Sequence, residues 1–292
     1  MATLRDIRRR IQAVRSTAKI TSAMRMVAAA KLRRAQESVW AARPYVQKLR
    51  EILSHVAATD AALLHPFFGI RREVNAIGLV VIAADRGLCG SFNSNVLRAA
   101  QQHLEHLRQQ FPKARLELLA LGGRAVNYLR KYAAELLGYE RPGLFSPLRM
   151  ESAYEIAHFL MDAYLAGRYD RIEVLSNEFR SVLRQEVCHR VLLPITAPQR
   201  QAQRVDYIFE PSQLEILDAL LPMYVRVQFW QLLLESHTAE QAARMLAMEN
   251  ATNNARELIR HLQLQYNKER QAAITKEMVE IASGAEALRS QG

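Results

Sequence analysis

The chain has 292 residues, of which half are apolar, and a formal net charge of +11. This length allows one or two domains with a buried core, and no run of about 18 uncharged apolar residues exists, so we expect no direct insertion into a membrane. Cys89 and Cys188 are far apart and lack metal-ligand spacing, which excludes a disulfide-rich secreted protein and favours two free thiols in a reducing compartment.

The first 40 residues contain no glycine or proline and carry apolar residues at helical spacing. This pattern predicts a helix about 60 Å long. Residues 1–50 hold thirteen Lys or Arg against Asp6 and Glu37, a difference of +11, which equals the net charge of the whole chain. A segment this basic favours an acidic partner, and nucleic acid, an anionic membrane surface and an acidic protein cavity all remain open. The first residues lack the apolar core of a signal peptide, so we expect no cleaved targeting segment.

The middle of the chain alternates between strand and helix patterns. Residues 76–84 form a continuous apolar run, typical of a strand covered on both faces. We expect further strands at 116–121, 171–175, 187–195 and 207–210, and helices at 94–110, at 126–136 and, capped by Ser152, up to residue 166. This alternation predicts a mostly parallel sheet with helices on its faces, a Rossmann-like α/β domain.

A glycine-rich turn, Asp85 to Ser91, follows the first strand and precedes a helix, where many α/β folds bind phosphate. Its spacing matches neither the Walker motif nor the dinucleotide-binding fingerprint, and no histidine or acid accompanies Cys89 in a recognisable local pattern. We therefore expect a structural or docking turn, with no catalytic residue and no cofactor. His103 and His106 share a helix face, but without a third ligand nearby we expect them to face solvent and to bind no metal.

The stretch from Met223 to Ser283 again lacks glycine and proline, and it predicts a helix about 90 Å long. Apolar residues follow a 3, 4 spacing in both terminal segments, at Leu4, Ile7, Ile11, Val14 and Ala18, and at Met245, Met248, Thr252, Ala255, Ile259, Leu262 and Tyr266. Such a repeat predicts a left-handed coiled coil, and the two segments would pair antiparallel because domain termini usually lie close together. The expected division is an N-terminal coiled-coil helix (1–65), an α/β domain (66–212) and a C-terminal coiled-coil helix (213–292).

Three blocks of sequence resemble the gamma subunit of the F-type ATP synthase, in its bacterial form. They are residues 20–32 (ITSAMRMVAAAKL), residues 85–90 (DRGLCG), and residues 266–277 (YNKERQAAITKE) followed by 280–285 (EIASGA). The blocks occur in family order near both ends and in the middle, so the resemblance covers essentially the full chain. The inserted cysteine pair of the chloroplast form is absent, which favours a bacterial protein.

The resemblance implies a non-catalytic central rotor shaft that couples ion flow through the membrane c-ring to ATP synthesis or hydrolysis on the beta subunits. The implied partners are the alpha and beta subunits, the epsilon subunit and the c-ring, at the cytoplasmic face of a bacterial plasma membrane. The implied contact residues are Met24, Arg25, Arg33 and Arg34 for the beta-subunit lever, Arg270, Gln271 and Thr275 for its catch loop, and Tyr207 and Glu210 for the c-ring and epsilon side. For the last pair, an edge strand ending at Pro211 is an equal alternative.

Two other classes of protein remain as alternatives. A nucleic-acid-binding coiled coil would explain the basic helix and would bind duplex DNA or RNA in a strongly salt-dependent way, but it leaves the α/β domain unexplained. A nucleotide-using enzyme would explain the strand, glycine turn and helix, but the phosphate-binding motif is missing. We therefore expect neither nucleic acid nor a bound nucleotide.

Overall fold

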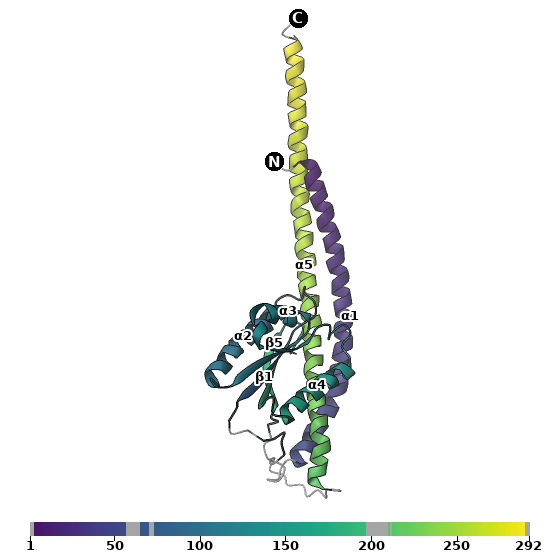
Figure 1. The fold of residues 1–292 in the computed structure, drawn as a ribbon. Coiled ribbons are helices and arrows are strands. Elements are labelled where there is room, and N and C mark those ends of the chain that lie inside the picture. Colours follow the sequence, from purple (N-terminus) through teal and green to yellow (C-terminus); the bar gives the residue numbers. More distant parts are fainter. Residues whose placement is uncertain (1–2, 57–64, 70–72, 197–209, 211, 290–292) are drawn as a thin grey trace. The chain divides into compact units, whose positions relative to one another are not determined.

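The computed structural model describes residues 3–56, 65–69, 73–196, 210 and 212–289. These residues form two compact units, one from residues 1–27 and 247–292, here the helical unit, and one from residues 28–246, here the sheet unit (Figure 1). The elements in chain order are α1 (Leu4–Val56), β1 (Ala76–Ile82), α2 (Phe92–Gln110), β2 (Arg115–Leu121), α3 (Gly123–Tyr132), the 3-10 turn η2 (Ala134–Leu136), β3 (Leu137–Arg141), α4 (Met150–Leu165), β4 (Arg171–Phe179), β5 (Gln185–Leu193) and α5 (Gln213–Arg289). Among the described helices, none is both long and apolar enough to cross a bilayer.

The sheet unit is built around a five-stranded sheet with the order β3-β2-β1-β4-β5. β1 pairs in parallel with β2 and β4, β2 pairs in parallel with β3, and only β5 runs antiparallel, to β4. All seven residues of β1 are buried, as expected for a central strand covered on both faces. The predicted mostly parallel sheet in an α/β domain is therefore confirmed.

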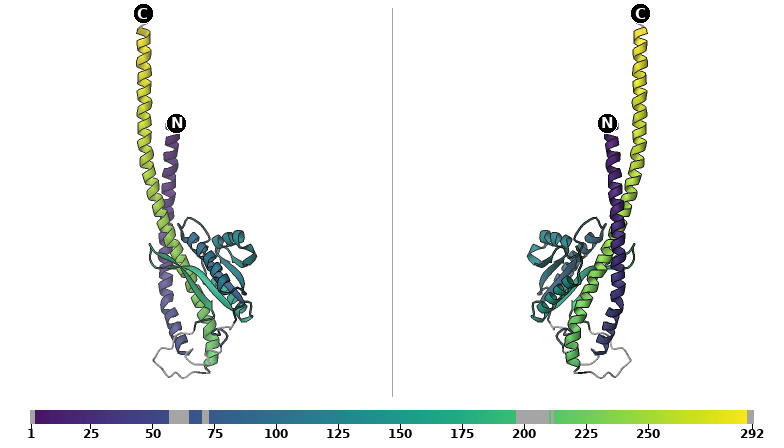
Figure 2. Two further views of the ribbon diagram at one scale, coloured as in Figure 1. Left: turned by 90° about the vertical axis from the view of Figure 1, so that its left-hand side faces the viewer. Right: turned by 90° about the vertical axis from the view of Figure 1, so that its right-hand side faces the viewer.

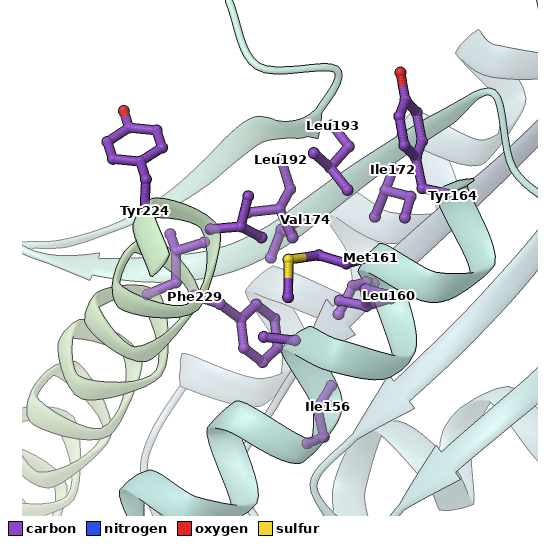
Figure 3. Packing of buried hydrophobic residues seen from close by; sticks show 14 of the residues in the cluster. Ile156, Leu160, Met161, Tyr164, Ile172, Val174, Leu192, Leu193, Tyr224 and Phe229 are labelled. Carbon is purple, nitrogen blue, oxygen red and sulfur yellow. The ribbon is translucent and has the colours of Figure 1, made fainter. Parts of the chain in front are cut away.

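One face of the sheet packs against α4 and the parts of α1 and α5 that belong to this unit. Leu49 and Leu53 of α1 and Phe229 of α5 join the same buried cluster as Ile156 and Leu160 of α4. Figure 3 shows side chains from α4, α5 and the strands gathered around Met161. This packing explains why α1 continues through Pro44 and α5 begins before Pro222, although proline disfavours a helix interior. Both helices thus reach beyond the proline-free stretches.

The other face of the sheet is covered by α2 and α3. Its buried cluster contains Leu79 and Val81 of β1, Val96 of α2, Val126 of α3 and Leu175 of β4. β1 therefore sends alternate side chains into two different cores, as the period of two in a strand requires. The consequence for the site is that α2 lies directly over β4, the strand that carries Glu173.

Within the helical unit, α1 and α5 run antiparallel. Arg8 contacts Tyr266, Thr21 contacts Thr252 and Arg25 contacts Glu249, so partners fall in number along α5 as they rise along α1. The buried seam residues of this unit are Ile7, Thr21, Met248, Thr252, Ala255 and Leu262. The predicted seam and its antiparallel pairing are confirmed, with Thr21 as an additional member. Its hydroxyl lies 2.7 Å from that of Thr252, so this polar pair is satisfied inside the seam.

The C-terminal part of α5 has no partner helix among the described residues. Every residue from Gln271 to Ala285 is exposed, including Ile274, Met278, Val279 and Ile281. In both views of Figure 2 the yellow end of α5 continues beyond the purple end of α1. An exposed apolar stripe on a single helix indicates a surface that another chain covers.

Several details differ from the sequence expectations, and one is the helix predicted at 126–136, because α3 ends at Tyr132 and a 3-10 turn follows it. Ser152 does not cap α4, because the helix begins at Met150 and Arg149 occupies the N-cap. β3 was not expected, since it is a short edge strand with only half-buried or exposed side chains and shows no apolar run. α5 also continues through Gly284 to Arg289, so the helical pattern does not end at that glycine. β4 extends to Phe179, four residues beyond the predicted strand.

Candidate partner-contact surface

The positive charge of the helical unit lies on α1. Residues 1–27 contain seven Lys or Arg against the single acid Asp6, whereas residues 247–292 contain six of each sign. Asp6 is held at the start of α1, where the Thr3 side chain and backbone donate hydrogen bonds that lower its pKa. Asp6 is therefore engaged within the first turn of α1.

Arginines line a groove between the two helices of this unit. Arg5, Arg8, Arg9 and Arg15 come from α1 and Arg260 from α5, around a space of about 1060 Å³. Arg8 donates a hydrogen bond of 2.6 Å to the hydroxyl of Tyr266, and its guanidinium carbon lies 5.5 Å from the centre of that ring. The stacked aromatic ring fixes the position of one cation in the groove. Sequence analysis missed this groove, although four arginines facing an aromatic at the end of the seam were the available signal.

Met24 and Arg25 lie on α1 within the helical unit, and both are half-buried. Arg25 forms an ion pair of 3.9 Å with Glu249 of α5, and both side chains are close to half exposed. Such a long, exposed pair contributes less than about 1 kcal/mol, so Arg25 can exchange it for another acidic partner.

Arg33 and Arg34 lie on α1 within the sheet unit and are exposed. Arg33 pairs with Glu37 at 3.1 Å, one helical turn later, with 84% of its side chain exposed. The pair is therefore a weak surface contact, and both guanidinium groups face solvent.

Arg270, Gln271 and Thr275 lie on the unpartnered part of α5. Gln271 and Thr275 are exposed and share a helix face because they are four residues apart. Arg270 is also exposed and neighbours that face. The predicted polar cluster is thus accessible on a single helix.

The two residues assigned to the c-ring and epsilon side are only partly described. Tyr207 and the other residues of the predicted strand up to 209 lie outside the described residues, and the last residue of that strand, Glu210, is not in a strand. Glu210 is an exposed residue in a bend just before α5.

The glycine-rich turn is held by its own polar side chains. The carboxylate of Asp85 accepts hydrogen bonds from the backbone N–H groups of Gly123, Gly143 and Phe145, at 2.7 to 2.9 Å. Arg244 of α5 donates to the backbone carbonyls of Arg86 and Gly87 at 3.4 and 3.2 Å. The turn therefore connects β1 with the loop that precedes α4 and, through Arg244, with α5. This role is structural, and the contribution of Arg244 was not predicted from the sequence.

Cys89 is buried beside Ala84, Phe92, Ala239 and Ala243. Burial raises the pKa of its thiol, the nearby Arg244 only partly opposes this effect, and the amide of Asn93 donates to its sulfur at 3.1 Å. A buried thiol that stays protonated is a poor nucleophile.

For the rotor subunit that the sequence resembles, we expect Cys89→Ser to leave ATP turnover of the assembled complex within a few-fold of the wild-type rate, because the thiol is buried and protonated. Turnover per assembled complex measures this effect. A loss of turnover with normal assembly would instead assign chemistry to the turn.

A polar cluster joins α2 to the β4–β5 hairpin, where sequence analysis expected only solvent-facing histidines. His103 is half-buried and its Nε2 lies 2.5 Å from Oε2 of Glu173, while Nε2 of His189 lies 2.7 Å from the same oxygen. Arg171 donates to the other oxygen of Glu173. Burial opposes ionisation of Glu173, but the bonds from the two histidines and Arg171 outweigh it and lower its pKa well below the usual range. The expectation for His103 was wrong because the cluster residues Glu173 and His189 come from strands at least 70 residues later in the chain, whereas His106 is exposed as expected.

Comparison with known proteins decides the family. A family model described as ATP synthase matches residues 3–288. The ATP synthase gamma chain of Chlorobium phaeobacteroides (strain BS1) is 45% identical over 296 residues and covers 100% of both chains. That of Prosthecochloris aestuarii is 46% identical over 293 residues and covers 99% of each chain. The chain belongs to the ATP synthase gamma-chain family.

Solved structures agree with this assignment. A chain from the central stalk and c-ring of Tetrahymena thermophila mitochondrial ATP synthase is 26% identical, with a TM-score of 0.59 over 80% of this chain and 99% of that one. A rotor chain of Euglena gracilis mitochondrial ATP synthase shares the fold at 20% identity, with a TM-score of 0.66 over 93% of this chain and 98% of that one. As a member of this family, the chain is a central shaft subunit and a peripheral part of the F1 assembly, and catalysis takes place on the beta subunits. The predicted family, fold and non-catalytic shaft function are confirmed.

Proposed function

We propose that this gamma chain turns inside a ring of alternating alpha and beta subunits and transmits rotation from a membrane c-ring, at the cytoplasmic face of a bacterial plasma membrane. The observation that carries the proposal is the helical unit, whose paired helices give way to a single exposed helix beyond the start of α1. A helix with polar and apolar side chains exposed on all sides suits contact with several surrounding subunits in turn. The epsilon subunit would bind to the sheet unit, beside the c-ring.

The beta-subunit lever would contact α1 at Met24 and at the basic residues Arg25, Arg33 and Arg34. Exposed ion pairs contribute about 0 to 1 kcal/mol each, so they break and reform without holding the shaft at one angle. The arginine-lined groove around Arg8 and Tyr266 is a cationic surface within the helical unit and suits an acidic loop. The catch loop of a beta subunit would contact Arg270, Gln271 and Thr275.

The asymmetry of the shaft would then set the states of the three catalytic sites. Each beta subunit meets a different side of the shaft at any moment, and a contact that differs in free energy between two conformations shifts their populations. No bound cofactor or chemical step on the gamma chain is needed for this coupling.

Tyr207 and Glu210 would carry the contact with the c-ring and epsilon subunit. Glu210 is exposed just before α5, which supports its access to a partner. The proposed functional division is into coiled-coil segments at 1–65 and 213–292 and an α/β foot at 66–212, whose bounds differ from those of the two compact units.

Co-purification tests the assembly directly. The full chain with a tag should retain alpha, beta and epsilon subunits and the c-ring after detergent extraction of membranes. Retention should persist after nuclease treatment, because nucleic acid is not a partner. Recovery of nucleic acid in place of these subunits would support the basic coiled-coil alternative and overturn the proposal.

Replacing Arg33 and Arg34 together by Gln should weaken ATP-driven ion pumping more than the same change at Arg108 and Lys113. All four side chains are exposed, but only the first pair lies on the basic surface of α1. Pumping per hydrolysed ATP, measured at equal amounts of complex, reports the coupling. Equal losses in the two double variants would show that general charge, and not this contact, is responsible.

A further inference from the structure

The cluster of His103, Glu173 and His189 places three potential metal ligands together in the sheet unit. One atom from each residue, two imidazole nitrogens and one carboxylate oxygen, lies within 4.8 Å of the other two. The residues come from α2, β4 and β5, so the fold brings them together from three separate elements. The shaft function does not use this cluster.

The local fold explains why the three side chains converge. In the register of the β4–β5 ladder, His189 is opposite Leu175, two residues from Glu173 on the same face of β4. Leu175 belongs to the buried cluster between the sheet and α2. Glu173 and His189 therefore also lie on the face of the sheet that α2 covers, and His103 is on α2. The register of the β4–β5 ladder therefore places the side chains of Glu173 and His189 on the same side of the sheet as His103.

Both histidine nitrogens point at a single carboxylate oxygen. Oε2 of Glu173 lies 2.5 Å from Nε2 of His103 and 2.7 Å from Nε2 of His189, while Arg171 occupies Oε1. A tetrahedral zinc ion with bonds of about 2.0 to 2.1 Å separates its ligand atoms by about 3.3 Å, so shifts of less than about 1 Å would open the centre. Arg171 would act as the outer partner that orients the ligating carboxylate.

We propose that His103, His189 and Glu173 form a binding site for a divalent transition metal ion of the zinc type, which joins α2 to the β4–β5 hairpin. Two imidazoles and one carboxylate are an established zinc ligand set, with a fourth position left for water. The His189 side chain is 37% exposed and gives the ion a path from solvent, while Glu173 is buried. Because β5 is an edge strand, the ion stabilises the margin of the sheet that faces α2.

Zinc titration of the full chain against a chromophoric zinc chelator tests the site. The wild-type chain binds one Zn²⁺ per molecule, and His189→Asn and His103→Asn each lower the affinity by at least about tenfold. His106→Asn is the matched control, since His106 is on the same helix, three residues away, but outside the cluster. Cys188→Ser is the second control, because that thiol neighbours His189 in sequence.

A second measurement does not depend on the folding of any variant. In the wild-type chain with ¹⁵N-labelled histidine, Zn²⁺ should shift the Nε2 resonances of His103 and His189 and leave those of His106 and His158 in place. The proposal is overturned if the wild-type chain binds no zinc, if shifts occur at other histidines instead, or if Cys188→Ser abolishes binding while the two histidine variants retain it.

Discussion

Replacing Ile259 by proline should abolish coupled ATP synthesis or prevent assembly. Ile259 is a half-buried seam residue of α5 in the helical unit. Proline removes a backbone hydrogen bond and clashes with the preceding turn, which costs about 3 kcal/mol or more and bends the helix. A bent α5 loses its seam with α1 and misplaces the exposed residues that follow. ATP synthesis by membranes, normalised to the amount of complex, measures the effect.

Two controls separate bending from other effects. Ile259→Ala removes the same side chain but keeps the backbone hydrogen bond, so it should cost stability without stopping synthesis. Deleting residues 287–292 should leave synthesis near normal, because they follow a stretch of α5 whose side chains are all exposed. Normal synthesis by an assembled Ile259→Pro complex would show that α5 is not a continuous mechanical helix.

Replacing Gly122 by alanine should lower the free energy of unfolding of the chain by at least about 3 kcal/mol. Gly122 has φ of +92° between β2 and α3, and an added Cβ would lie 1.9 Å from the carbonyl oxygen of Ala83. The left-handed conformation alone costs a non-glycine residue about 1 to 2 kcal/mol, and relieving the clash requires the end of β1 to move. Denaturant unfolding of the full chain measures the loss.

Gly143 supplies the matched control for this substitution. It also has a positive φ, of +78°, but an added Cβ meets nothing within 4 Å. Gly143→Ala should therefore show only the conformational cost of about 1 to 2 kcal/mol. Equal losses at the two positions would mean that the contact with Ala83 is not decisive.

The sequence predicted the elements whose patterns are local and strong. The apolar run of β1 reflects burial on both faces of the sheet and therefore identifies a buried strand. The 3, 4 spacing around Met248, Thr252 and Ala255 reflects packing against one other helix and therefore identifies a coiled-coil seam. β3 lacks such a pattern, because an edge strand buries little. The helices continue through Pro44 and Pro222 because tertiary packing outweighs the local preference for a break.

The contact residues were harder to predict than the fold. The assignment of Met24, Arg270 and Thr275 as contact residues depends on the family resemblance. Their accessibility is compatible with that assignment, and their partners stay predictions. Sequence separation hid the interactions of Arg244 with the glycine-rich turn and of His103 with Glu173, since no local spacing relates these residues. Both depend on how α5 and α2 pack within the sheet unit, which only the three-dimensional structure shows.

Observation of rotation in single complexes tests the central account most directly. The catalytic ring is fixed to a surface, and a bead is attached to an exposed residue of this chain in the sheet unit, for example a cysteine introduced at Lys113. Addition of ATP should drive unidirectional stepwise rotation of the bead, in three main steps per turn if three catalytic sites act in sequence. Complexes that hydrolyse ATP at the normal rate while the attached bead stays still would contradict the assignment of this chain as the rotating shaft.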